Sequence, residues 1–186
     1  MKLSFNPDLW KYPIGEYKPP SIIDQGHITD WIDQIQRFPD RLYEITSNMS
    51  TDQYEWCYRP DGWSIRELIH HCGDSHMHAL LRLKWALFTE KPTILGYDEA
   101  IWVTATDVKQ CAPVISIQLL DALHERWVSL LRSLNETDWS KGYFHPETKS
   151  FVRIDEYIGS YAWHCEHHYR HILLALDHEG KYKATH

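Results

Sequence analysis

Four stretches of the chain repeat apolar residues at the spacing of an α-helix, and this pattern limits the possible folds more than any other feature. The stretches cover about 28–48, 64–88, 116–134 and 155–178. Apolar residues three and four positions apart place a stripe on one face of each helix, and that stripe has to be buried. Four such helices and one long connection predict an all-α four-helix bundle.

Residues with strong conformational preferences mark the helix ends. Ser64 and Glu67 form the S-x-x-E pattern of a capping box at the start of the second helix. Asp155 is a good N-cap for the last helix, and Gly180 suits the position just beyond its end. Pro39 lies inside the first stretch, where we expect it to break or kink the helix.

Two connections are expected to have structure of their own. Residues 89–112 form a long crossover, with one short helix near 98–103. Residues 143–154 alternate apolar and polar side chains around a Pro-containing turn, which predicts a small β-hairpin. The length of 186 residues suits a single domain, 1–186. We expect an extended N-terminal arm at about 1–25 that packs on the body through aromatic side chains, namely Trp10, Tyr12 and Tyr17.

Composition narrows the class of protein. The formal charge is −7 and the chain has no Lys/Arg run, so we expect no nucleic-acid partner. No apolar stretch reaches the roughly 18 residues that a membrane span needs, and the first residues lack the apolar region of a signal peptide. The four cysteines form no C-x-x-C pair, which favours a reduced, cytoplasmic chain.

Histidine is the unusual residue, with 13 copies, most of them in two clusters. The clusters read "HHCGDSHMH" at 70–78 and "HCEHHYRH" at 164–171. In the last helix, His164 and His168 have the i, i+4 spacing that brings two imidazoles to one metal, and they lie at the edge of the apolar arc. His167 and His171 have the same spacing but turn toward the charged side, so we interpret them as surface or outer residues.

The second helix offers the third ligand by the same geometry. His71 lies at the edge of its apolar arc and is the best candidate, with His78 next. His76 lies inside the arc, where a core histidine bonded to a backbone group or a carboxylate is the simpler reading. Cys72 and Cys165 lie on the apolar arcs and are interpreted as small core residues.

The last helix differs from a zincin helix. Those proteases use H-E-x-x-H, in which the glutamate is the base. Here Cys165 follows His164, and Glu166 lies roughly on the far side of the helix. The sequence therefore names no general base.

Several segments together resemble one known family. They are "GWSIRELIHHCGDSH" (62–76), "ALHERWVSLLRSL" (122–134) and "YAWHCEHHYRHI" (161–172), with "YPIGEYKPP", "KPTILGYDEAIW" and "FHPE" between or before them. In this order they resemble the YfiT-like branch of the DinB superfamily, over nearly the whole chain. The resemblance implies an up-down-down-up bundle and one divalent metal, nickel or zinc. It also implies three histidine ligands, at positions that match His71, His164 and His168, and a homodimer.

The resemblance implies an enzyme, and the predicted site allows two reactions. Members of this branch are regarded as candidate metal-dependent hydrolases, and related members transfer thiols such as bacillithiol. Three neutral imidazoles leave a cation with open positions, where it would activate either water or a thiol. We rank a hydrolase first, a thiol S-transferase second and a non-catalytic metal-binding protein third. The substrate is a small molecule in either reaction.

Other residues are weaker candidates for a role at the predicted site. Asp74 and Glu67 are candidates to hydrogen-bond the far nitrogen of His71, with ordinary solvated charges as the simpler reading. Arg82, nearly in line with His71, could bind a substrate carboxylate or phosphate, or could form a surface ion pair. Tyr97 and Trp102 on the crossover could wall the pocket, but we favour packing of that loop on the bundle, and Lys109 could hold the carboxylates of a thiol. The direction of His145 and Glu147, at the hairpin, is not fixed by the sequence.

Overall fold

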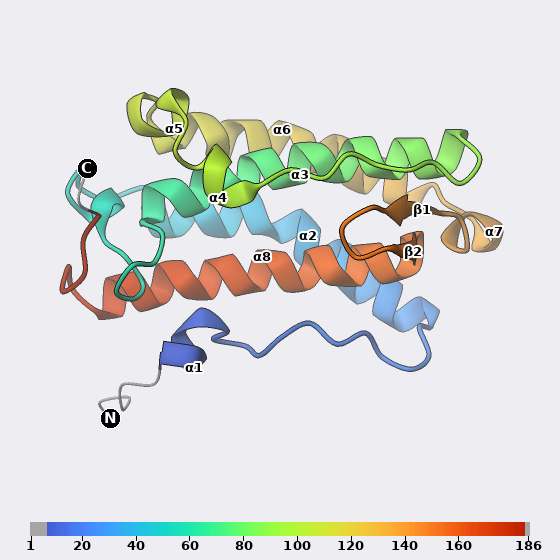
Figure 1. Ribbon diagram of the computed structural model, residues 1–186, viewed down its shortest axis with the longest axis horizontal. Coiled ribbons are helices and arrows are strands. Elements are labelled where there is room, and N and C mark those ends of the chain that lie inside the picture. The colour runs from blue at the N-terminus through green and yellow to red at the C-terminus, as the bar shows by residue number, and fades with distance from the viewer. Residues whose placement is uncertain (1–6, 185–186) are drawn as a thin grey trace.

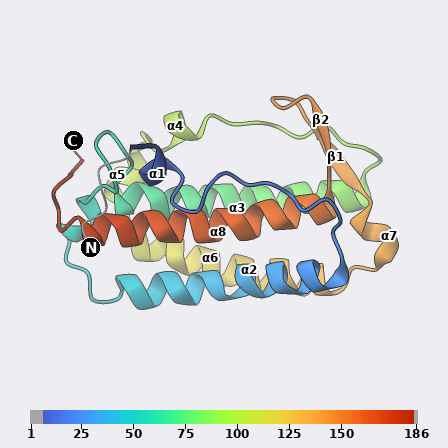
Figure 2. The ribbon, with the colours of Figure 1, turned by 90° about the horizontal axis from the view of Figure 1, so that it is seen from below.

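Four long helices carry the apolar stripes and form the bundle, in a computed structural model that describes residues 7–184 (Figure 1). They are α2 (Gln25–Thr46), α3 (Ile65–Phe88), α6 (Pro113–Arg132) and α8 (Ile154–Asp177). Each helix contacts two others, so that α2, α6, α3 and α8 follow one another around the bundle (Figure 2). All four predicted helices are confirmed, with each end within three residues of the prediction.

The helix directions give the up-down-down-up order. The chain colours in Figure 1 show that α3 and α6 run the same way, whereas α2 and α8 run the opposite way. Two helices that follow each other in parallel need a connection that returns along the bundle. The crossover between Phe88 and Pro113 provides it, and it contains α4 (Glu99–Trp102) and α5 (Thr106–Gln110). The sequence predicted the first of these short helices and missed the second.

The hairpin is also present. Strands β1 (Gly142–His145) and β2 (Ser150–Arg153) pair antiparallel, and Tyr143 lies opposite Val152. The crossover runs beside β1, where the Phe144 amide donates to the Pro92 carbonyl at 2.8 Å. This contact fixes the crossover and the hairpin on the same side of the bundle. A short helix, α7 (Glu136–Trp139), connects α6 to the hairpin.

The N-terminal arm lies along α8 (Figures 1 and 2). It packs on the body as predicted, since Trp10 is buried and the Tyr17 hydroxyl donates to the Glu156 carbonyl at 3.3 Å. It is not wholly extended, because Pro7–Lys11 form a short helix, α1. Residues 1–6 of the expected arm and 185–186 of the expected domain lie outside the described residues.

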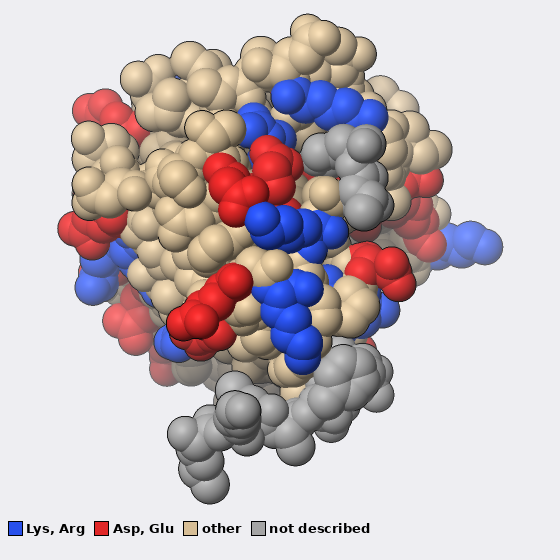
Figure 3. All heavy atoms as spheres, turned by 90° about the vertical axis from the view of Figure 1, so that its left-hand side faces the viewer, with Lys and Arg blue, Asp and Glu red and all other residues tan. Residues whose placement is uncertain are grey.

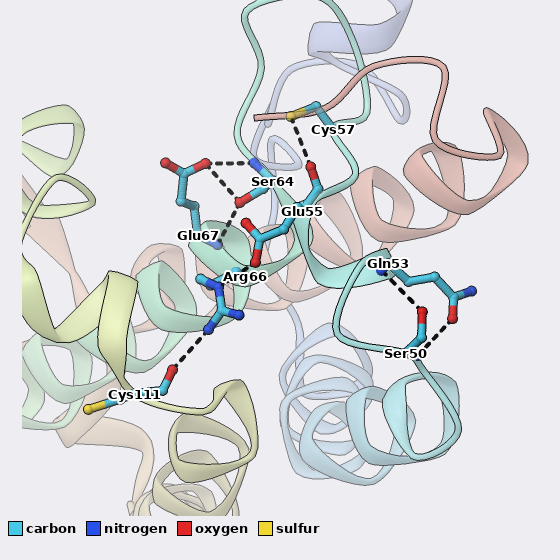
Figure 4. Close-up of polar contacts among 8 residues, drawn as sticks. All are labelled: Ser50, Gln53, Glu55, Cys57, Ser64, Arg66, Glu67 and Cys111. Atoms are coloured by element: carbon cyan, nitrogen blue, oxygen red, sulfur yellow. Dashed lines mark hydrogen bonds and ion pairs between the residues drawn. The ribbon is translucent and has the colours of Figure 1, made fainter. Parts of the chain in front are cut away.

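The start of α3 is fixed by side chains (Figure 4). Ser64 caps the helix, and Glu67 accepts from the Ser64 amide at 2.7 Å, which completes the predicted capping box. Arg66 then joins two connections to the helix. It pairs with Glu55 of η1 (Gln53–Glu55) at 2.8 Å and donates to the Cys111 carbonyl at 3.0 Å. These contacts hold both connections beside the N-terminal end of α3.

Two details differ from the prediction. Of the two effects expected of Pro39, the break is not found, because the first helix runs through it from Gln25 to Thr46. The loss of one backbone hydrogen bond is tolerated there because packing holds the helix, and Pro39 is itself buried. The last helix begins at Ile154 with Arg153 at the cap, whereas Asp155 was the predicted cap. Asp155 instead bonds Arg153, which extends the helix by one residue.

The core lies between the four helices and contains large fully buried side chains such as Trp127, Tyr157 and Phe38. Cys72 and Cys165 are 1% exposed, as predicted for small core residues. At the end of the molecule shown in Figure 3, Lys and Arg lie beside Asp and Glu. Among the described residues, no helix is long and apolar enough to cross a membrane.

Candidate metal centre

Three histidines converge between the helices α3 and α8. They are His71 on α3 and His164 and His168 on α8, and one nitrogen of each lies within 4.8 Å of the others. The two α8 rings are one turn apart, with centroids 4.4 Å from each other. The structure therefore brings together the three residues that the sequence selected.

The donor set fits a divalent cation. His71 Nε2 and His164 Nε2 are 3.2 Å apart. Two nitrogens that bind one tetrahedral zinc ion at its usual bond length lie about 3.3 Å apart. Imidazole is also a ligand that suits both zinc and nickel. The cluster could thus hold the cation that the sequence predicts.

Burial keeps these rings uncharged. Desolvation lowers the pKa of His71 to about 4, and the neighbouring His167 lowers it further. The pKa values of His164 and His168 lie well below the usual range for the same first reason, with repulsion between the rings second. Neutral imidazoles keep the lone pairs that a metal needs at pH 7.

The cluster opens into a polar cavity of about 470 Å³. Side chains from distant segments line it, including Arg82 of α3, Tyr97 of the crossover, and His145 and Glu147 of the hairpin region. Those last three residues therefore do reach the site, which the sequence had left open. Arg82 is only 8% exposed, so its charge faces the cavity and not the bulk solvent.

Arg82 has no carboxylate partner within ion-pair distance in the described part of the chain. One guanidinium nitrogen donates to the Leu95 carbonyl at 3.3 Å, and Nε has no partner there. The hydroxyls of Tyr143 and Tyr161 are its other polar neighbours. The surface ion pair considered from the sequence is therefore not formed. A guanidinium so placed can bind an anionic group of a substrate.

His76 is the core histidine that the sequence predicted, but its partners are different. It is 0% exposed, and it bonds two other histidines instead of a backbone group or a carboxylate. Its Nδ1 lies 2.7 Å from His124 Nε2, and its Nε2 lies 3.1 Å from His164 Nδ1. His124 takes a position in the apolar stripe of α6, and the sequence analysis assigned it no role. Both His76 and His124 take positions in the apolar stripes of their helices, and this shared placement was the signal in the sequence that could have predicted their contact.

His167 and His171 are buried, at 6% and 2% exposure, so the surface alternative is wrong and only the alternative of a position behind the ligands is left. The helix alone turns them toward the charged side, but other segments cover them. Tyr12 of the N-terminal arm lies over His167 with ring centroids 5.8 Å apart, and Tyr58 stacks on His171 at 3.9 Å. A helical projection cannot include these covering segments, which come from other parts of the fold.

The weaker candidates lie away from the three histidines. Glu67 is used in the α3 cap, and no described hydrogen bond joins Asp74 to His71. His78, the second choice for the third ligand, stacks on Tyr97 with centroids 4.5 Å apart. Trp102 packs on His78 and Tyr97, which is the packing role that we favoured, and Lys109 is exposed on α5.

Glu166 is turned away from the cluster, as the zincin comparison predicted. It accepts from Arg41 of α2 at 2.7 Å and also bonds Arg170. These two ion pairs hold the pKa of Glu166 below its usual range, although partial burial acts in the opposite direction. The residue ties α8 to α2 and does not act as a base at the cluster.

Comparison with known proteins agrees with the geometry. The family model described as the DinB superfamily matches residues 34–172. YfiT of Bacillus subtilis, named as a candidate metal-dependent hydrolase, is 39% identical over 87% of this chain and 90% of its own length. A protein of Oceanobacillus iheyensis with the same designation is 43% identical over 87% of this chain and 93% of its own.

The solved structure of Bacillus subtilis YfiT has the same fold. It superimposes with a TM-score of 0.89 at 37% identity, covering 92% of this chain and 98% of that one. Its title describes a four-helix bundle of unusual topology and a probable metal-dependent hydrolase. The names of the relatives and the histidine groups together suggest metal dependence here. With this match in sequence and fold, the chain belongs to the DinB superfamily.

Proposed function

We propose that this protein is a hydrolase that uses one divalent cation, zinc or nickel, held by His71, His164 and His168. The convergence of three neutral imidazoles beside a polar cavity supports this proposal most directly. When bound, such a cation supplies a Lewis acid that polarises a carbonyl group and lowers the pKa of water to about 7. The substrate is a small molecule, in keeping with a cavity of about 470 Å³.

The residues of the cavity wall bind and orient the substrate. Arg82 is the buried cation that lacks a carboxylate, so we assign it to a carboxylate or phosphate group of the substrate. His145 and Glu147 approach from the hairpin side and are two of the titratable groups on the wall that could carry a proton. Burial lowers the pKa of His145, with Arg82 the second cause, so this ring is neutral and able to accept a proton at pH 7.

A thiol S-transferase is the second candidate, at the same three histidines. Its supporting observation is that three cations line the cavity, since Lys11 and Arg59 join Arg82. They would hold the carboxylates of a low-molecular-weight thiol. Three acids line the same cavity, Asp61, Glu99 and Glu147, so no net positive charge favours an acidic thiol over other substrates. Hydrolysis therefore stays first, and a metal-binding protein without turnover stays third.

We also propose that the chain forms a homodimer in the cytoplasm. Exposed apolar side chains on the crossover support an interface, because Leu95 is 75% exposed and Ile101 is 64% exposed. Sedimentation at micromolar concentration should give about twice the chain mass of 22.1 kDa. Sedimentation as a monomer alone would remove the dimer from the proposal.

The function is tested by metal analysis followed by paired assays. Zinc- and nickel-loaded protein is offered esters, amides and lactones, each with and without a carboxylate, and then an electrophile with added thiol. We expect hydrolysis that His164→Ala abolishes. Metal-dependent conjugation of the thiol, with no hydrolysis of the panel, would reverse the ranking.

Arg82→Gln sharpens the same assay. Loss of a charge-assisted contact should raise KM about 10-fold or more for substrates that carry a carboxylate. The matched neutral substrates should be unaffected, since they make no such contact. Equal effects on both series would show that Arg82 is structural.

A further inference from the structure

Two runs of hydrogen bonds lead outward from the candidate metal centre. The inner run joins His164 Nδ1 to His76 Nε2 at 3.1 Å, then His76 Nδ1 to His124 Nε2 at 2.7 Å. It ends where His124 Nδ1 meets the Ile35 carbonyl at 2.7 Å. Its members come from α8, α3, α6 and α2, so this one run connects all four helices of the bundle.

The last group of the inner run fixes the direction of every bond. A carbonyl oxygen only accepts, so His124 Nδ1 carries a proton. A neutral imidazole has one proton, which leaves His124 Nε2 as an acceptor and makes His76 Nδ1 the donor. The same step makes His164 Nδ1 a donor to His76 Nε2. His164 Nε2 is then left without a proton, and it is the atom that lies 3.2 Å from His71 Nε2.

The rings of this run are neutral, as the argument requires. His76 and His124 are 0% and 2% exposed. Neither ring has a carboxylate partner in the described part of the chain, and an imidazolium buried without one is strongly disfavoured. Phe38 and Trp127 pack against both rings, with Trp127 edge-on to each.

Pro39 explains why the Ile35 carbonyl is available. In a helix, the carbonyl of residue 35 would accept the amide of residue 39, but proline has no amide hydrogen. The freed carbonyl lies inside the bundle and would be a buried unpaired acceptor without His124. The residue that seemed to break the first helix thus supplies the end point of the inner run.

The outer run starts from the other ligand candidate of α8. His168 Nδ1 lies 3.4 Å from His171 Nδ1, and His171 Nε2 lies 3.2 Å from the Lys11 carbonyl of the N-terminal arm. The carbonyl again accepts, so His171 carries its proton on Nε2 and accepts at Nδ1. His168 then carries its proton on Nδ1, and only its Nε2 has a lone pair.

We propose that His76, His124 and His171 are positioning residues that hold His164 and His168 as Nδ1-protonated rings, each with a bare Nε2 for the cation. Outer partners that fix the tautomer and direction of a ligand raise its affinity for metal. Here imidazoles and backbone carbonyls do for His164 and His168 what the sequence considered only for His71, with Asp74 and Glu67 as candidate partners. The inference concerns the metal-free rings, so it does not depend on which reaction the site catalyses.

A second group of histidines gives the competing explanation. His167, His168 and His171 also bring one nitrogen each within 4.8 Å of one another and could hold a cation of their own. That group shares His168 with the first one, and a cation bound there would take His171 from the outer run. The two explanations therefore differ in stoichiometry, with one cation per chain in our proposal.

The first test reads the tautomers directly. Long-range ¹H–¹⁵N correlation spectra of the metal-free protein at pH 7 show which ring nitrogen of each histidine carries the proton. We expect a proton on Nδ1 for His76, His124, His164 and His168, and on Nε2 for His171. A proton on Nε2 of His164 would overturn the inner run, and a proton on Nδ1 of His171 would overturn the outer one.

The second test measures zinc affinity by competition with a chelator. His124→Leu removes the acceptor for His76 and should lower the affinity about 10- to 100-fold. His124→Gln can still accept from His76 and donate to Ile35, so it should restore most of the affinity. His70→Leu is the matched control, since His70 is a buried α3 histidine that bonds Ser116 and belongs to neither run.

The outcomes separate positioning from simple core packing. In His124→Leu, the His164 nitrogens should lose their single-tautomer signature, which a packing role would not change. Affinity in His124→Leu equal to that in His70→Leu would overturn the proposal. Binding of two zinc ions per wild-type chain would assign His171 to a second metal site and overturn the outer run. If His124→Leu fails to fold, the tautomers measured in the wild-type protein still test the proposal.

Discussion

The two runs of histidines end in very different surroundings. The inner run lies between the four helices, its bonds are 2.7, 2.7 and 3.1 Å, and it ends on α2. The outer run lies under the N-terminal arm, its bonds are 3.4 and 3.2 Å, and it ends on α1. His164 is thus held by residues of the core, whereas His168 is held by the N-terminal arm on the outside of the bundle. Disturbing the inner run should therefore affect both stability and metal affinity, whereas disturbing the outer run should affect mainly the metal.

The largest effect is expected at the ligands themselves. His164→Ala should lower zinc affinity by more than the about 10- to 100-fold typical of an outer partner, because it removes a bond to the cation. His167→Ala is the matched variant one turn away, and it should change the affinity little. Isothermal titration with zinc measures both. Equal losses would show that the wrong face of α8 has been chosen.

The next effect compares the two runs in protein stability. His76→Phe leaves a buried donor on His164 and a buried acceptor on His124 without partners. Each such group costs about 1–3 kcal/mol. His171→Phe can keep the stacking on Tyr58 and disturbs only the longer bonds, so it should cost less. Urea unfolding of the metal-free variants measures the difference, and a greater loss for His171→Phe would reverse our ordering of the runs.

A smaller effect is expected in how the free energy of unfolding depends on pH. The pKa of His124 is about 4 in the folded state, lowered by burial from a usual value of 6.5. Between these two pH values His124 is protonated in the unfolded chain but neutral in the folded chain. The free energy of unfolding therefore decreases as the pH falls. The slope from this one group is at most about 1.4 kcal/mol per pH unit. His124→Gln should therefore show a shallower loss from pH 6.5 to 4, and an unchanged slope would contradict the assignment.

The smallest effect is expected at Pro39. Pro39→Ala restores the amide that can bond the Ile35 carbonyl, which would then be shared between that amide and His124. We expect the helix to remain intact and the zinc affinity to fall less than in His124→Leu. The same chelator competition measures it. An affinity below that of His124→Leu would mean that Pro39 acts by some route other than this carbonyl.

The helices and the hairpin were predicted correctly because both follow from local patterns in the sequence. The helices could be predicted because each apolar stripe is a local pattern, and the Ser64 capping box is complete within four residues. The hairpin followed from local alternation as well. The cap of the last helix was misplaced by two residues, because Arg153 caps it and bonds Asp155 in the structure, and local sequence does not decide between these two positions.

The sequence by itself determined the helices, their directions through the family resemblance, and the selection of His71, His164 and His168 by spacing and facing. Only the tertiary structure decided their surroundings. It buried His167 and His171 under other segments, paired His76 with His124, and brought the Pro39-freed carbonyl of Ile35 to the end of that pair. The physical reason is that helical periodicity gives the direction of a side chain from its own axis. Hydrogen-bond partners on other helices depend on how the axes pack, which no local pattern specifies.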